Sequence, residues 1–269
     1  MARKIFTVSF IFGIIMLILA IFKYGLPELK VVFLDVGQGD SALIKAPNGQ
    51  IVLIDGGPDN KVLRGLGKNL PFYHRNLDFL VISHYHDDHI TGLIEIIRRY
   101  RVKALIYSGK IPDSPLILDL LEVASQYKVE LRPINSQVEI IFGPDCRLNF
   151  LNPGILVAKD DSNESLVARL NCDNRSFLFA GDNGAALESA IINSGWSLKA
   201  DVFKASHHGS NTSNSLSFLE KVAPHFIVVS VGTDNRFGHP GPFFLERAAA
   251  LGIPVKRTDQ DGDIKIFAK

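Results

Sequence analysis

The stretch S-H-Y-H-D-D-H, residues 83–89, directly follows an apolar run and decides how the rest of the chain is interpreted. Three of the eight histidines of the chain fall within it, beside two aspartates. Alternate side chains at the end of a strand share a face, so we expect His84 and His86 to point the same way. The helical pattern that follows brings Asp88 and His89 to the same mouth. Because imidazoles and carboxylates are ligands that Zn²⁺ and similar ions prefer, this loop predicts a metal site.

The alternative is a polar loop with incidental histidines, whose aspartates only cap the next helix. One loop supplies half of a metal site, however, and three other apolar runs end in side chains that would complete it. These are Asp55 in I-V-L-I-D, Asp182 in S-F-L-F-A-G-D, and His207 and His208 in A-D-V-F-K-A-S-H-H. A carboxylate at the end of a buried strand is destabilising unless a metal or a hydrogen-bond network receives it. We therefore expect Asp182 to bridge two ions and Asp55 to orient a ligand histidine.

Short strand patterns and helical patterns alternate along the rest of the chain. Strands are expected at 30–36, 41–45, 51–55, 78–83 and 104–107, in five stretches between 129 and 182, and at 201–205, 226–231 and twice near the C-terminus. Helices are expected at 90–100, 115–127, 184–194, 215–223 and 242–251. Strand-rich stretches that each lead into helices favour two mixed sheets with helices packed outside them.

Eight short motifs occur in order from Val31 to the C-terminus. They are F-L-D-V-G-Q-G-D-S (33–41), I-D-G-G (54–57), S-H-Y-H-D-D-H (83–89), N-E-S-L-V (163–167), F-A-G-D (179–182), H-H-G-S (207–210), G-H-P (238–240) and R-T-D-Q-D-G (257–262). Together they resemble the metallo-β-lactamase domain of ComEC-type competence proteins. The histidine motif alone indicates only the metallo-β-lactamase superfamily, whereas D-V-G-Q-G-D combined with H-H-G-S is more specific.

The resemblance implies an α/β (α+β) fold, a four-layer αββα sandwich with a two-metal site at one edge. It implies that His84 and His86 hold one ion, that Asp88 and His89 hold the other, and that Asp182 bridges them. A histidine of the 207–208 pair would complete the second ion. We prefer His207, which is nearer the strand end, and leave His208 for the substrate.

The chain departs from the superfamily in one respect, because no histidine lies between His89 and His207. Many members supply a metal ligand from that interval, and we expect water, Asn163 or Ser165 to stand near this position, as in the ComEC-type subgroup. True β-lactamases generally need that histidine, so its absence argues against antibiotic hydrolysis.

Two loops near the expected site carry further candidates. His239, in F-G-H-P-G-P, would protonate a leaving group or grip a phosphate, and its alternative role is that of a turn histidine. The loop S-N-T-S-N-S, residues 210–215, offers Ser210, other hydroxyls and backbone N–H groups to an anion. It equally has the composition of a helix N-cap.

The first thirty residues differ from the rest. Arg3 and Lys4 precede an apolar run over residues 5–22, which as a helix would be roughly 27 Å long, close to the thickness of a bilayer core. A cleaved signal peptide would need small residues before the cut, and the run offers no clear site. We therefore prefer a signal anchor within residues 1–28 over a signal peptide or a buried helix. A domain at 29–269 would then lie outside the cytoplasm.

The net charge and the two cysteines do little to narrow the function or the compartment of the protein. Residues 1–30 hold four cations and one anion, so the remainder carries 25 cations against 27 anions, a formal charge of −2. Broad neutralisation of nucleic acid would need a basic domain. The local cluster Arg98, Arg99, Arg101 and Lys103 would guide a polyanion or simply complement a helix dipole. Cys146 and Cys172 fit either small core residues or, in an extracellular domain, one disulfide.

Two divalent metal ions, Zn or Mn, are the expected cofactors, and the expected chemistry is hydrolysis of a phosphate-containing substrate. DNA or another phosphodiester outside the membrane is our first choice. The alternatives are another envelope substrate, such as a phosphorylated polymer or a lactone, and a non-enzymatic role with DNA-uptake machinery. The residues expected to act on substrate or water are Asp88, Asp182, His208 and His239.

Overall fold

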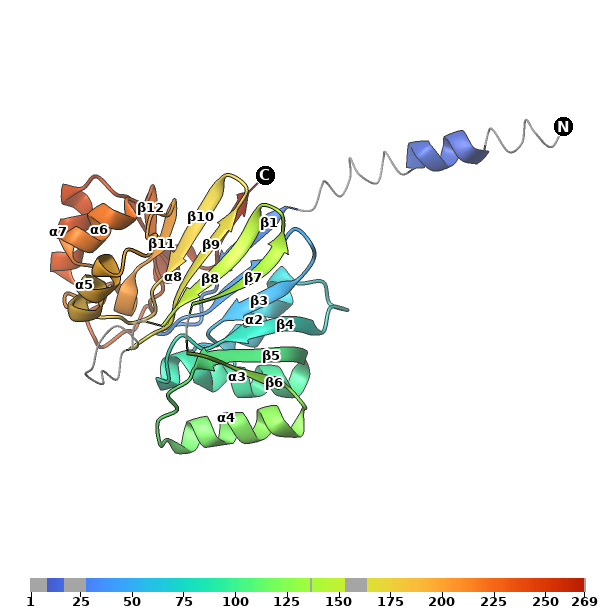
Figure 1. The fold of residues 1–269 in the computed structure, drawn as a ribbon, viewed down its shortest axis with the longest axis horizontal. Helices are drawn as coiled ribbons and strands as arrows, with labels where there is room; N and C mark the ends of the chain where they lie inside the picture. Colours follow the sequence, from blue (N-terminus) through green and yellow to red (C-terminus); the bar gives the residue numbers. More distant parts are fainter. Residues whose placement is uncertain (1–8, 17–27, 136, 153–163, 269) are drawn as a thin grey trace.

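Two seven-stranded sheets face each other, and helices cover both outer faces (Figure 1). The computed structural model describes residues 9–16, 28–135, 137–152 and 164–268. The layers follow the order helices, sheet, sheet, helices. The expected αββα sandwich is therefore confirmed, and its active edge can be located from the strand directions.

The first sheet has the order β14-β1-β2-β3-β4-β5-β6. Its strands are β1 (Leu29–Phe33), β2 (Ala42–Lys45), β3 (Ile51–Ile54), β4 (Asn76–Val81), β5 (Arg101–Ser108), β6 (Glu130–Ile134) and β14 (Ile264–Ala268). Strands β1 to β3 form an antiparallel meander, and β3 to β6 run parallel. Parallel neighbours need crossover connections, which α2 (Lys61–Asn69), α3 (Asp87–Arg99) and α4 (Pro115–Gln126) provide.

The second sheet has the order β13-β12-β11-β10-β9-β8-β7. Its strands are β7 (Val138–Gly143), β8 (Cys146–Leu151), β9 (Val167–Cys172), β10 (Arg175–Phe179), β11 (Val202–Lys204), β12 (Phe226–Val229) and β13 (Val255–Arg257). Strands β7 to β10 are antiparallel, and β10 to β13 are parallel. The helical elements of this half are α5 (Ala185–Asn193), the short η2 (Ser206–Gly209), α6 (Leu216–Val222), α7 (Pro242–Ala250) and α8 (Thr258–Asp261).

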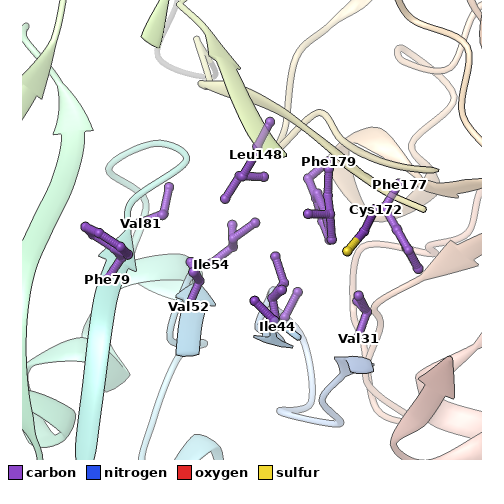
Figure 2. Packing of buried hydrophobic residues seen from close by; sticks show 14 of the residues in the cluster. Val31, Ile44, Val52, Ile54, Phe79, Val81, Leu148, Cys172, Phe177 and Phe179 are labelled. Atoms are coloured by element: carbon purple, nitrogen blue, oxygen red, sulfur yellow. The ribbon is translucent and has the colours of Figure 1, made fainter. Parts of the chain in front are cut away.

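The inner faces of the sheets form the central core. Ile44 and Val52 from the first sheet point toward Phe177 and Phe179 from the second (Figure 2). These side chains are almost fully buried because strand residues alternate between the two faces of each sheet. Each sheet also packs against the helices on its outer face through one further apolar cluster. The rigid sandwich holds the loops at its edges in fixed positions.

Cys146 and Cys172 form a disulfide between β8 and β9, at positions directly opposite each other in the antiparallel pair. Both residues are buried in the central core. The sequence left pairing and simple packing as alternatives, and the structure shows the pair.

Helix α2 is the main element that the sequence pattern did not predict. It contains Gly65 and Gly67, which lower helix propensity. Gly65 has a packing role, because a Cβ there would lie 3.0 Å from a methyl carbon of Leu34. Close contact with the first sheet therefore overrides the weak local preference.

The predicted anchor lies mainly outside the described residues, since only 9–16 of the run are described, and these are helical. No helix within the described parts of the chain combines the length and apolar character needed to cross a bilayer. Asn163 also lies outside the described residues.

Candidate metal centre

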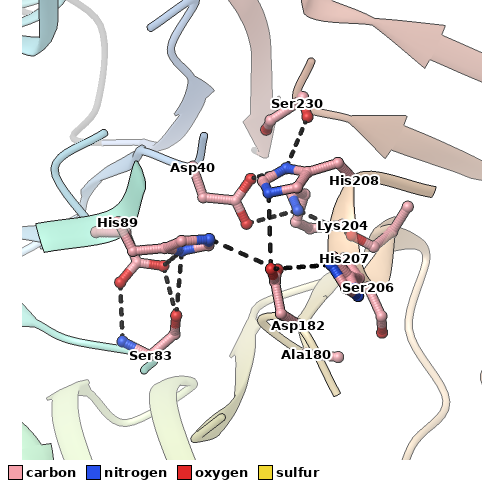
Figure 3. A network of polar contacts seen from close by, with 12 residues as sticks. Asp40, Ser83, His89, Ala180, Asp182, Lys204, Ser206, His207, His208 and Ser230 are labelled. Carbon is pink, nitrogen blue, oxygen red and sulfur yellow. Dashed lines mark hydrogen bonds and ion pairs between the residues drawn. The ribbon is translucent and has the colours of Figure 1, made fainter. Parts of the chain in front are cut away.

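The site forms where the carboxyl ends of parallel strands from both sheets meet at one edge. Asp55 directly follows β3, His84 follows β4 and its Ser83, Asp182 follows β10 and its turn, and His208 follows β11. A strand of the core can bury its apolar side chains and still deliver the next polar residue to the edge. Figure 3 shows His89, from the segment after β4, and His207 and His208, from the segment after β11, around Asp182.

His84, His89 and Asp182 form a fully buried cluster. The Nε2 atoms of His84 and His89 lie 3.6 Å from Oδ2 and Oδ1 of Asp182, respectively. Both Nε2 atoms and Asp182 Oδ1 lack a hydrogen-bond partner among the described residues. A buried polar atom without a partner destabilises a fold by about 1–3 kcal/mol. Three such atoms facing one another fit a divalent cation, for which imidazole nitrogen and carboxylate oxygen are suitable ligands.

Asp88 and His208 form a second cluster with His89. His208 Nε2 lies 3.1 Å from Asp88 Oδ2 and 3.7 Å from Asp182 Oδ2, and His89 Nε2 lies 3.8 Å from Asp88 Oδ2. Asp182 therefore stands between the two clusters, the position that a bridging ligand requires. The arrangement fits two cations that share this carboxylate.

The distances favour His208 over His207 as a ligand, contrary to our sequence-based preference. His207 Nε2 lies 3.9 Å from Asp182 Oδ2, and its side chain is 29% exposed against 2% for His208. Both residues adopt left-handed backbone conformations, with φ of 49° and 52°. This turn sends His208 into the buried cluster and leaves His207 at the opening, which strand periodicity does not predict.

His86 lies beside the clusters without joining those that bring three donor atoms within 4.8 Å of one another. Its ring centroid is 4.6 Å from that of His84, and the side chain is half-buried. His86 is also the N-cap residue of α3, where no side chain makes a capping hydrogen bond. The alternative role of Asp87 and Asp88 as caps is therefore not seen.

Asp55 occupies the orienting position expected for it. Its Oδ2 accepts a hydrogen bond from His89 Nδ1 at 2.9 Å and another from Ser83 Oγ at 2.7 Å. Its Oδ1 accepts from the Ser83 backbone N–H at 2.8 Å. Holding the proton of His89 on Nδ1 leaves Nε2 free to face the cluster, as is common for metal-binding histidines.

Asp40 and Lys204 lie beside His208, and neither was among the site residues predicted from the sequence. Asp40 Oδ1 lies 3.3 Å from His208 Nδ1, which also lies 3.0 Å from the carbonyl oxygen of Ser230. Lys204 Nζ lies 2.6 Å from Asp40 Oδ2 and donates to Ala205 O. The available signals were the aspartate that ends D-V-G-Q-G-D and a lysine inside the apolar run V-F-K-A.

The electrostatics of the clusters suit an exchange of protons for cations. Burial opposes protonation of His208, but the carboxylates of Asp182 and Asp40 outweigh it and raise the pKa of His208 to about 9. Burial likewise opposes a charge on His89, and Asp182 and Asp55 raise the pKa of His89 well above its usual value. His208 and His89 overcome the effect of burial on Asp182 and hold its pKa well below the usual range. Divalent ions would replace these protons as partners of the carboxylates.

Ser165 positions the backbone of Asp182. Its hydroxyl accepts a hydrogen bond from the Asp182 N–H at 2.8 Å, and the residue is completely buried. Gly181 allows this contact, since a Cβ there would lie 2.3 Å from Ser165 Cβ. The structure thus brings Ser165 to the site as a support of the bridging position.

His239 lies at the opening of the site. Its ring centroid is 5.6 Å from that of His207 and 6.1 Å from that of His208. Burial and the two neighbouring histidines lower its pKa to about 4, so the ring is neutral near pH 7. A neutral imidazole can donate one N–H to a phosphate oxygen but is a poor proton source, which favours the gripping role.

The 210–215 loop ends in a helix cap, which was the alternative interpretation of its sequence. Ser215 is the N-cap of α6 and accepts a hydrogen bond from the Phe218 N–H. Ser210 is largely buried, and its hydroxyl pairs with that of Thr212 at 3.0 Å. His74 contacts the carbonyl oxygen of Asn76 and His225 contacts Asp201, both outside the clusters.

Known proteins resemble the chain in both sequence and fold. ComE operon protein 3 of Bacillus subtilis is 27% identical over 268 residues, covering 93% of this chain and 34% of that protein. Competence protein ComA of Neisseria gonorrhoeae is 30% identical over 242 residues, covering 88% of this chain and 32% of that protein. The chain thus spans about a third of the length of these relatives.

Solved structures share the fold at low sequence identity. The metallo-beta-lactamase fold protein YhfI from Bacillus subtilis has a TM-score of 0.63 at 13% identity, covering 90% of this chain and all of that chain. A diphosphatase from the PhnP family has a TM-score of 0.52 at 18% identity, covering 89% of this chain and 98% of that chain. These likenesses concern the fold alone.

A family model describes most of the chain. The model of the metallo-beta-lactamase superfamily matches residues 34–232. The two-sheet sandwich and the buried clusters that fit divalent cations agree with this match and with a metal-dependent hydrolase. The chain therefore belongs to the metallo-beta-lactamase superfamily.

Proposed function

We propose that the chain is a phosphodiesterase that acts on DNA or another phosphodiester outside the membrane, using two divalent ions, Zn or Mn. The observation that carries the proposal is the set of three buried atoms without hydrogen-bond partners among the described residues, His84 Nε2, His89 Nε2 and Asp182 Oδ1, with Asp182 also adjacent to the second cluster. Divalent cations in such a site lower the pKa of water to about 7 and stabilise charge on phosphoryl oxygens.

The residues of the chain divide the remaining work. Asp182 and Asp88 would hold the cations on their carboxylates, while Asp55 and the carbonyl oxygen of Ser230 accept the Nδ1 protons of His89 and His208. His239, neutral at the opening, would donate its N–H to a phosphate oxygen. These contacts are fixed by the fold itself, so little reorganisation is needed during the reaction.

Support for the substrate class comes from the relatives. One relative is named a competence protein and the other is named for the ComE operon, and their similarity covers 88% and 93% of this chain. This context favours DNA among phosphodiesters. The domain outside residues 1–30 is near neutral, so binding is expected to depend on the site and its cations more than on broad charge.

The proposal on location rests on the apolar run at 5–22 and on the disulfide. Structural disulfides form and persist in oxidising compartments such as the cell exterior. The buried Cys146–Cys172 pair therefore supports export of the domain, with the N-terminal run as its anchor.

Metal content and a substrate panel test the function together. The full-length protein would be depleted with chelator, reloaded with Mn²⁺ or Zn²⁺, and assayed on single- and double-stranded DNA, bis(p-nitrophenyl) phosphate and a lactone. We expect about two bound ions and hydrolysis of the phosphodiesters. Asp182→Ala should bind fewer ions and lose at least ~10³-fold in rate.

Three outcomes would change the assignment. Hydrolysis of the lactone alone would favour the alternative envelope substrate. Bound ions without hydrolysis of any substrate, together with DNA binding, would favour a non-enzymatic role in DNA uptake. Absence of bound metal after reloading would refute the metal-dependent mechanism.

A further inference from the structure

A basic cleft with a volume of about 510 Å³ lies at the edge of the first sheet opposite the metal centre. It is bounded by the start of β4, the start of β5 and the C-terminal end of α3. Its lining includes Tyr73, Arg75, Arg98, Arg99, Arg101 and Tyr127. Since α3 carries Asp88 and His89 in its first turn and spans 13 residues, roughly 20 Å separate the cleft from the metal centre.

The cleft carries excess positive charge. Four arginines line it, all of them exposed, and no carboxylate does. Glu95, which lies outside the lining, pairs with Arg98 and Arg99. The Arg75 guanidinium packs over the ring of Tyr100 at 5.5 Å from the centroid. Arginine forks held in a concave surface suit the phosphate of a polar headgroup.

Two large aromatic side chains project beside these arginines. Phe72 and Tyr73 lie on the connection between α2 and β4 and are 84% and 73% exposed. Their rings contact each other edge to face at 5.4 Å. Exposed aromatics next to basic residues are typical of surfaces that lie at the boundary between water and lipid.

The strand directions place the N-terminal entry of the domain at the same edge. Strands β1, β3, β4 and β5 run the same way. The first residues of β1, β4 and β5, which are Leu29, Asn76 and Arg101, therefore all lie at this edge. Figure 1 shows the start of β1 and the connection between α2 and β4 on one side of the molecule. Three strand spacings separate β1 from β4, about 14 Å.

The tether is short. The apolar run ends at Phe22, seven residues before Leu29, and seven residues span at most about 25 Å when fully extended. If the run lies in a bilayer, as proposed above, this edge must stay close to the lipid headgroups. The metal centre then faces away from the membrane.

We infer that this edge is a lipid-docking surface, at which the arginine-lined cleft binds anionic phospholipid headgroups while Phe72 and Tyr73 enter the interface. The inference rests on the proposed anchorage and is independent of the proposed substrate. Docking restricts the orientation of a tethered domain and presents the metal centre to polymers arriving from outside. A nucleic acid in this cleft would instead be held on the membrane side, away from the metals.

A single fluorescent label tests the docking. The two native cysteines are paired, so Pro71→Cys on the exposed connection can be labelled specifically with a polarity-sensitive dye. The full chain would be placed in discs of phosphatidylcholine and in discs that also contain phosphatidylglycerol. We expect a blue shift only with the anionic lipid. Reversing two arginines, Arg75→Glu/Arg101→Glu, should lower the docked-to-undocked ratio by at least about 30-fold, because the loss of each positive charge alone accounts for about fivefold.

The matched control reverses two exposed cations at the metal edge, Lys61→Glu/Arg236→Glu, and should keep the shift. Hydrolysis of a small soluble phosphodiester should be unchanged in Arg75→Glu/Arg101→Glu, which shows that this variant is folded. No lipid-dependent shift, or an equal shift in the charge-reversed variant, overturns the inference. A loss of oligonucleotide binding without any lipid response would reassign the cleft to nucleic acid. Failure of the chain to elute with the discs refutes the anchorage, and the docking with it, but leaves the hydrolase proposal intact.

Discussion

His207 and His208 are neighbours in the chain but differ in what they can bind. Only His208 reaches Asp88 and Asp182 with a buried Nε2 whose partner nitrogen is already held by Ser230 and Asp40. We therefore predict that His208→Ala loses about one of the two bound ions and at least ~10³-fold in hydrolytic rate. His207→Ala should keep both ions. Elemental analysis of the two purified variants distinguishes them, and equal metal loss would contradict the assignment.

Asp40 and Lys204 form a buried ion pair that also orients His208. Asp40→Asn should weaken metal binding about 10- to 100-fold, the usual effect of removing a group that supports a metal ligand. It should also destabilise the fold by about 3–5 kcal/mol, because Lys204 stays buried without a counter-charge. Titration with Mn²⁺ and urea unfolding measure the two effects separately.

The variant Asp40→Asn/Lys204→Met separates the roles of this pair. Removing both charges should restore most of the stability, since a buried pair replaced by uncharged groups is often neutral. The metal affinity should stay low, because His208 still lacks its carboxylate. Recovery of full metal affinity in the double variant would show that Asp40 serves only as the partner of Lys204.

Residue types and strand ends predicted which side chains gather, but not every direction in which they point. Asp55, Asp88, His89 and Asp182 lie close together in the structure, and each stands where a buried strand ends or a helix begins. The choice between the histidines of the 207–208 pair depended on consecutive left-handed residues, which need Gly209 and the surrounding loops. A charged side chain within an apolar run, such as Lys204, reveals its partner only when both sheets are assembled.

At the scale of elements, Glu188 of α5 holds the loop that follows the site histidines. Its carboxylate accepts hydrogen bonds from the N–H groups of Asn214 and Ser215. Asn214 in turn pairs with both backbone groups of Ser206, two residues before His208. In the sequence Glu188 is only one glutamate in a predicted helix. Its hydrogen bonds to Asn214 and Ser215 could therefore not be predicted.

Burial of this carboxyl makes the link sensitive to pH. Burial raises the pKa of Glu188 above its usual 4.5, against the effect of its backbone donors. Between the unfolded and folded pKa values the folded state binds more protons, so stability falls as the pH rises from about 4.5 through the folded pKa. We predict that Glu188→Gln becomes more stable relative to the native chain as the pH rises through this window. Urea unfolding with chelator present checks this, and a constant difference across the window would contradict it.

Element boundaries followed the sequence patterns closely where apolar periodicity was strong, as in α3 and β4. Helix α2 was missed because two glycines weaken its pattern, and one of them is there for contact with Leu34. The pairing of β14 with β1 could also not be predicted from local sequence patterns. It joins residues more than two hundred positions apart, and only the assembled sheet determines that neighbour.

At the scale of the whole molecule, the central core, the disulfide and the proposed export are linked. Cys146 and Cys172 close a loop of 26 residues between two strands of the central core. In the chain-entropy view a loop of this size contributes roughly 3–4 kcal/mol of stability. For a domain of this length Cys146→Ala/Cys172→Ala should lower the Tm by roughly 10 °C. Thermal unfolding of the double variant and of the native chain measures this difference.

The compartment of the domain decides whether this bond forms. Exported protein should contain no thiol that reacts with an alkylating reagent after denaturation, because both cysteines are paired. A chain without residues 1–28, retained in the reducing cytoplasm, should expose two reactive thiols and melt at a lower temperature than the exported form. Mass spectrometry of alkylated protein from the two sources counts the thiols directly. If the full chain taken from intact cells carried two free thiols, the domain would have matured in a reducing compartment, and the proposed export of the domain would be wrong.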